Sequence, residues 1–142
     1  MILFYVLKLS YKNFTLYIYK NNIHTQNKMI TYNNKTQNRI EMTSPSDDVI
    51  INNCKTKAIT MYDGEVLSIY NCKDIEIVNV EGFKQLVICN CTISSLDLDV
   101  QDITIVDSKI NSINPSSATN IRLLNTTIKN ENYENEDVVQ RF

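Results

Sequence analysis

The string LVICNC, residues 86–91, recurs in altered form along the chain and decides the fold. Related strings are VIINNC (49–54), LSIYNC (67–72), ITIVDS (103–108) and IRLLNT (121–126). Each consists of apolar residues, then Asn or Asp, then a small residue. Alignment on the Asn or Asp gives spacings of 19, 18, 19, 17 and 18 residues for Asn34, Asn53, Asn71, Asn90, Asp107 and Asn125. Such regular spacing is typical of a solenoid, in which each coil stacks on its neighbours.

Each coil has two apolar stretches. Residues four and two positions before the Asn are apolar, as at Leu86 and Ile88, which predicts a short strand with one buried face. A second pair follows later in the coil, as at Leu96 and Leu98. The Asn or Asp between them suits a bend, because these residues tolerate the left-handed backbone region. The connections are too short for helical crossovers, so we expect parallel strands about 4.8 Å apart in a solenoid wall.

Three segments resemble the leucine-rich-repeat signature LxxLxLxx(N/C)xL. They are FKQLVICNCTI (83–93), VQDITIVDSKI (100–110) and ATNIRLLNTTI (118–128). The chain is therefore similar to the short, nested variants of the leucine-rich-repeat family, although its period is below the roughly 20 to 29 residues of ordinary members. The resemblance implies a β-rich solenoid with a parallel sheet of about six short strands. A right-handed parallel β-helix, which accepts such short coils, is the alternative.

The pattern divides the chain into three parts. Residues 29–128 form the predicted repeat solenoid. Residues 1–28 are an N-terminal extension upstream of Met29, a capping hairpin built from YVLKLS and FTLYIYK, or a weak signal or anchor; their longest apolar run, ILFYVL, is too short to span a membrane. Residues 129–142, KNENYENEDVVQRF, are an acidic C-terminal cap or a disordered tail.

Charge is distributed unevenly. Residues 1–42 hold six of the fourteen Lys and Arg residues and one acid, whereas residues 43–142 hold eight bases and fifteen acids. An acidic repeat body with no basic stripe is a poor match for a phosphate backbone, so we expect no nucleic-acid partner.

The cysteines are expected to have separate roles. Cys54, Cys72 and Cys91 occupy one inward position on three coils, and the one histidine, His24, lies outside the repeats. A linear thiol column does not make a tetrahedral metal site, so we expect buried, reduced thiols, no metal and no cofactor. Reduced thiols favour an intracellular, cytoplasmic location. Cys89 falls on the outward face instead.

The outward positions of the sheet form the predicted site. An exposed apolar stripe there indicates a protein partner, unless the C-terminal tail or the N-terminal extension folds over it. The predicted partner-binding residues are Ser68, Tyr70, Val87, Cys89, Thr104, Val106, Arg122 and Leu124.

Carboxylates provide the competing hypothesis, a β-helix that binds or cleaves polysaccharide. Glu41, Glu76, Asp97 and Asp99 are predicted to flank the second strand outwardly, with Thr60 in the same column, and paired acids hydrolyse glycosidic bonds in many enzymes. Without a basic side chain among them or a tryptophan to stack a sugar, we expect a non-enzymatic interaction module. A degenerate repeat product without a specific partner is a third reading.

Overall fold

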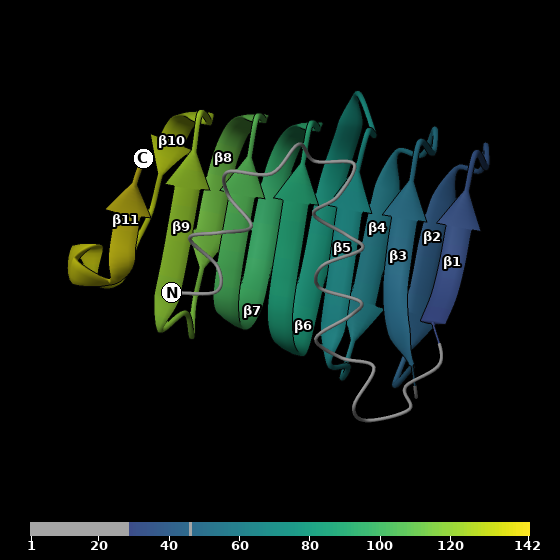
Figure 1. The fold of residues 1–142 in the computed structure, drawn as a ribbon, viewed down its shortest axis with the longest axis horizontal. Helices are drawn as coiled ribbons and strands as arrows, with labels where there is room; N and C mark the ends of the chain where they lie inside the picture. The colour runs from purple at the N-terminus through teal and green to yellow at the C-terminus, as the bar shows by residue number, and fades with distance from the viewer. Residues whose placement is uncertain (1–28, 46) are drawn as a thin grey trace.

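The computed structural model describes residues 29–45 and 47–142, and residues 1–28, with their predicted extension or hairpin, lie outside this range. The described chain is a parallel β-solenoid of about six turns (Figure 1). A β-rich solenoid of parallel strands was predicted, with a leucine-rich-repeat-like arrangement favoured and a right-handed parallel β-helix as the alternative. The stacked parallel solenoid is confirmed, and it is β-helix-like. The helical content of the described residues is one short 3-10 helix.

Two walls of strands face each other. The first wall contains β1 (Met29–Asn33), β3 (Asp48–Asn52), β5 (Val66–Tyr70), the second halves of β6 (Ile75–Cys89) and β7 (Thr92–Val106), β9 (Asn120–Leu124) and β11 (Val139–Arg141). The second wall contains β2 (Arg39–Thr43), β4 (Ala58–Tyr62), the first halves of β6 and β7, β8 (Lys109–Pro115) and β10 (Thr127–Glu131).

The core lies between the walls because alternate residues of most strands point inward; in β6 the alternation is interrupted at Glu76 and Ile77. Leu86 and Ile88 on the first wall and Leu96 and Leu98 on the second are at most 1% exposed. Their neighbours in the register are also apolar, so each column of the core continues from coil to coil. Two inward-facing stretches per coil are present, as predicted. In the third coil, however, the predicted pair Ile75 and Ile77 is wrong: Val78 and Val80 align with Leu96 and Leu98, and Ile77 is 51% exposed.

Asn and Asp turn the chain where the first-wall strands end, at the top of Figure 1, which we call the upper edge. All six aligned residues, from Asn34 to Asn125, have φ between 46° and 57°, the left-handed region expected of them. Their carboxamides also bond one another, as from Asn90 Nδ2 to Asn71 Oδ1 at 2.8 Å. The turn therefore repeats without glycine.

The small residue after the turn has a hydrogen-bonding role. Ser108 Oγ accepts from the Cys91 backbone N–H at 3.1 Å and donates to the Val106 carbonyl oxygen at 2.8 Å. The Cys72 thiol likewise accepts from the Cys54 N–H at 3.4 Å and donates to the Tyr70 carbonyl at 3.4 Å. Cys, Ser and Thr interchange at this position because each can both donate and accept.

The C-terminal segment continues the walls. The 3-10 helix η2 (Glu136–Val138) leads into β11, which pairs with β9, and Tyr133, Val138 and Val139 pack against the core. Arg141 Nη1 lies 2.9 Å from Glu131 Oε1, which joins the last strands of the two walls.

Candidate functional site

The register of the first wall brings the eight predicted partner-binding residues together. One column contains Ser68, Val87, Thr104 and Arg122, and a second contains Tyr70, Cys89, Val106 and Leu124. None of the eight belongs to the core cluster, whereas the inward residues between them do. We call these eight residues the outer wall.

The outer wall is less exposed than the sequence predicts. Ser68, Val87, Cys89, Thr104 and Val106 are 1% to 7% exposed, so the expectation of an open apolar stripe is wrong for them. Tyr70, Arg122 and Leu124 are half-buried.

Further residues extend the outer wall at both ends. Ile50, 6% exposed and outside the core cluster, pairs with Ser68, and Gln140 on β11 pairs with Arg122. Ile50 was not predicted to face outward, because residues 49–51 are all apolar and the inward and outward positions of this strand cannot be distinguished by hydrophobicity. The C-terminal tail does not cross this wall, because β11 adds a strand to its end.

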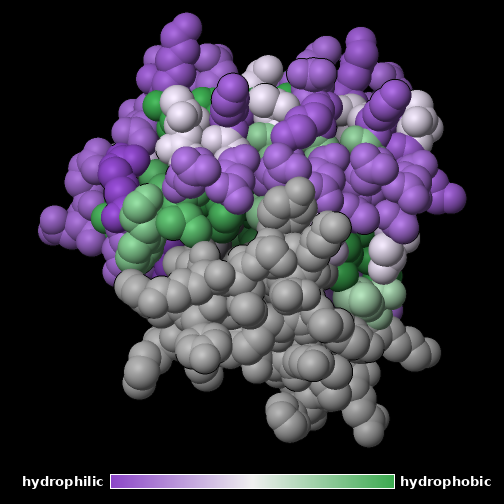
Figure 2. Space-filling model, turned by 45° about the horizontal axis from the view of Figure 1, so that its top comes forward, coloured by the Kyte–Doolittle hydropathy of each residue, from purple (hydrophilic) through white to green (hydrophobic). Residues whose placement is uncertain are grey.

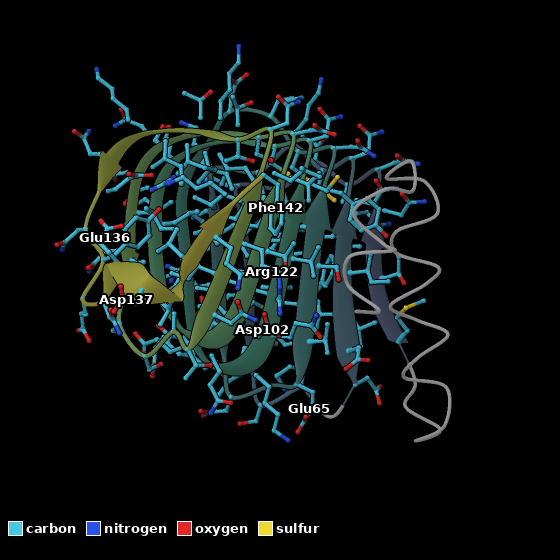
Figure 3. All side chains as sticks on the ribbon, turned by 60° about the vertical axis from the view of Figure 1, so that its left-hand side comes forward. Glu65, Asp102, Arg122, Glu136, Asp137 and Phe142 are labelled. Atoms are coloured by element: carbon cyan, nitrogen blue, oxygen red, sulfur yellow. The ribbon has the colours of Figure 1, made fainter. Side chains whose placement is uncertain are left out.

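Polar groups on the outer wall are held close to the strands. Arg122 Nη1 lies 2.6 Å from Asp102 Oδ1, with side chains 17% and 33% exposed, and Figure 3 shows the two residues on neighbouring strands. The hydroxyl oxygen of Thr104 is buried and has no hydrogen-bond partner within the described part of the chain. An unpaired buried hydroxyl is unfavourable, which makes this point of the wall receptive to a donor or acceptor.

The four cysteines are reduced and buried. Burial raises the pKa of the Cys89 thiol to about 12, with a smaller contribution from Asp107, and burial also raises the pKa of Cys91 well above its ordinary value. The Cys89 and Cys91 thiols are therefore poor nucleophiles and poor ligands near neutral pH, whereas the hydrogen bond with Cys91 lowers the pKa of Cys72. Within residues 29–45 and 47–142 no group of three or more His, Cys, Asp or Glu side chains is placed to hold a metal ion.

The acidic residues of the second wall do not form the predicted column. Glu41, Thr60, Asn79 and Asp97 pair in succession, which separates the two acids by three strand spacings, roughly 14 Å. Glu76 pairs instead with Lys57, at 3.8 Å, because the number of residues between turn and second strand differs among coils. Asp99 lies in another column, where it pairs with Glu81. Glu81 was not among the acidic residues predicted from the sequence.

The upper edge contains a basic stripe that contradicts the expectation of none. Two grooves there, of about 760 and 520 Å³, are lined by Lys55, Lys57, Lys73, Lys109 and Lys129. These are five of the eight bases in residues 43–142. They were missed because they are spread over 75 residues and gather only when the coils stack.

Comparison with known proteins found no matching family model, curated protein or solved structure. The likeness to leucine-rich repeats therefore stays a prediction. Among the described residues no helix is long and apolar enough to cross a membrane.

Proposed function

We propose that the chain is a non-catalytic, intracellular interaction module that binds a protein partner on its outer wall. The observation that carries this proposal is the presence of apolar side chains outside the core. Val87, Cys89 and Val106 pack on the outer side of the first wall, where they contribute nothing to the core cluster. Apolar residues in that position favour a covered surface.

The outer wall suits a polypeptide with apolar side chains. Within each column, successive residues lie about 4.8 Å apart, which is the spacing of the parallel strands. Backbone pairing of β5, β6, β7 and β9 fixes the side chains before contact, so little ordering entropy is lost on binding. Tyr70 and Leu124, which are half-buried, are the least buried apolar residues of this surface. Aromatic side chains are enriched at the centre of interfaces.

A charge on the outer wall tests the proposal. Tyr70→Asp and Leu124→Asp are compared with Ile77→Asp, because Ile77 lies on the second wall and is 51% exposed. Proteins retained by the immobilised full chain are identified, and the retained protein is purified for titration. We expect its Kd to rise more than tenfold with either outer-wall variant and to stay unchanged with Ile77→Asp.

Stability must be measured in parallel. The urea midpoints of Tyr70→Asp and Leu124→Asp should stay close to that of the wild type, since half-buried surface positions seldom contribute more than about 0.5 kcal/mol. Equal binding by all three variants would refute the proposal. Unfolding of both outer-wall variants would also refute it, because the wall would then be structural.

A further inference from the structure

We propose that the upper edge binds a linear anionic polysaccharide of the polyuronate class. This site is separate from the outer wall: it is formed by the turns that follow the first-wall strands, not by the strands themselves. Figure 2, in which the top of Figure 1 comes forward, shows hydrophilic side chains gathered along this edge.

A column of donor groups runs along the edge. Thr36 bridges Lys55, and Thr92 and Thr127 both pair with Lys109. Lys73 follows Cys72 as Lys55 follows Cys54, and the Thr92 N–H donates to the Cys72 carbonyl at 3.1 Å. The column therefore presents hydroxyl, ammonium, ammonium, hydroxyl, ammonium and hydroxyl groups on six successive coils, over about 24 Å.

The column lies in two grooves that meet. Lys55 and Lys73 line the first groove, Thr92, Lys109 and Thr127 line the second, and Asp74 borders both. Asn53 and Asn71 also line the first groove, and their amides are hydrogen-bonded along the turns, to Asn34 and Asn52. Amide and hydroxyl groups both donate and accept hydrogen bonds, which matches the hydroxyl groups of a sugar.

The ammonium groups are available to an anion. Lys55, Lys73 and Lys109 are exposed and form no ion pair with any described residue; Lys73 donates to the side chain and carbonyl of Asn90. Lys57 is paired with Glu76 through exposed side chains at 3.8 Å, a weak contact. Asp74 lines both grooves and Asp107 precedes the turn to Lys109, so the three lysines of the column outnumber these two acids.

A polyuronate fits this arrangement better than a nucleic acid does. It carries one carboxylate on each sugar, and its extended length per sugar is close to the strand spacing of about 4.8 Å. Single-stranded nucleic acids need aromatic side chains on which bases stack, and neither groove is lined by one.

Titration of the full-length protein with polygalacturonate at low salt tests the inference. Exposed charge contacts are modest, so each of Lys55→Gln, Lys73→Gln and Lys109→Gln should raise the Kd about twofold to fivefold. If the three effects are additive in free energy, the triple variant should raise the Kd at least about eightfold and flatten the dependence of binding on salt. Fully methyl-esterified polygalacturonate, which has the same backbone without charge, should not bind.

Lys84→Gln is the matched control. Lys84 pairs with Glu65 at 2.8 Å on the lower edge, opposite the grooves, where Figure 3 labels Glu65. Its removal changes the net charge as much as each single variant does and should leave the Kd unchanged. The inference is overturned if Lys84→Gln weakens binding equally, if the esterified polymer binds as well, or if an oligothymidylate binds more tightly than polygalacturonate. All three outcomes leave the outer wall untouched, so they are distinguishable from failure of the protein-binding proposal.

Discussion

Removal of one hydroxyl at the upper edge, in Ser108→Ala, should destabilise the solenoid measurably. Ser108 Oγ is the acceptor for the Cys91 N–H at 3.1 Å, and both residues are at most 2% exposed, so water cannot replace it. A buried N–H left without a partner costs about 1–3 kcal/mol. The Val106 carbonyl is affected less, because it still accepts from the Asn90 N–H at 3.0 Å.

Equilibrium urea unfolding followed by far-ultraviolet circular dichroism measures this loss. With a slope of about 1–3 kcal/mol per molar urea, a loss of about 2 kcal/mol lowers the midpoint by roughly 1 M. Ser108→Cys should retain most of the stability, because a thiol fills the same position in the two preceding coils. Ser94→Ala, at an exposed position on β7, should change the free energy of unfolding by less than about 0.5 kcal/mol. Equal midpoints for Ser108→Ala and the wild type, or equal losses for the Ala and Cys variants, would refute the assigned role.

Three further predictions concern the turns and the thiols. Asn71→Gly should retain more stability in urea than Asn71→Ala, because φ is 57° there and only glycine adopts it freely; similar losses would contradict this. Gly64→Ala should lower the midpoint by the equivalent of about 1–3 kcal/mol, because a Cβ there would overlap the Phe83 ring, and Phe83→Leu should rescue it in part; no loss would contradict this. The folded-state pKa of Cys89 is raised from 9.0 to about 12, so its contribution to stability is present below pH 9 and is lost between pH 9 and 12. Stability in urea should therefore fall less steeply over this range in Cys89→Ala, and parallel pH profiles would contradict the assignment.

The repeat could be predicted from the sequence because it depends on local chemistry. Alternating apolar residues such as Leu86 and Ile88 define inward columns, and an Asn at a constant spacing defines the turn. The coil register also separates Cys91, in the core, from Cys89, outside it.

The low exposure of the outer-wall residues and the positions of the charged side chains could not be predicted from the sequence, because both depend on what surrounds each side chain in the folded protein. Seven positions separate Asn71 from the inward Val78, whereas six separate Asn90 from the inward Leu96. This extra residue removes Glu76 from the column of Glu41 and Asp97. Hydrophobic alternation identifies the side of a strand, as for Val87, but not what covers that side. The clustering of lysines at the upper edge likewise cannot be recognised in the sequence, because it arises only when turns that are far apart in the chain stack on one another.

Site-specific photo-crosslinking from Tyr70 tests the central claim, binding of a partner to the outer wall, most directly. In one variant of the full chain a benzophenone amino acid replaces the half-buried Tyr70. In a control variant of the same chain it replaces Ile77, which is exposed on the second wall. We expect a crosslink from position 70, and not from position 77, to a distinct second protein. Crosslinks from position 70 only to residues 1–28 of the same chain would contradict it, since YVLKLS and FTLYIYK in that segment would then be the occupant of the wall.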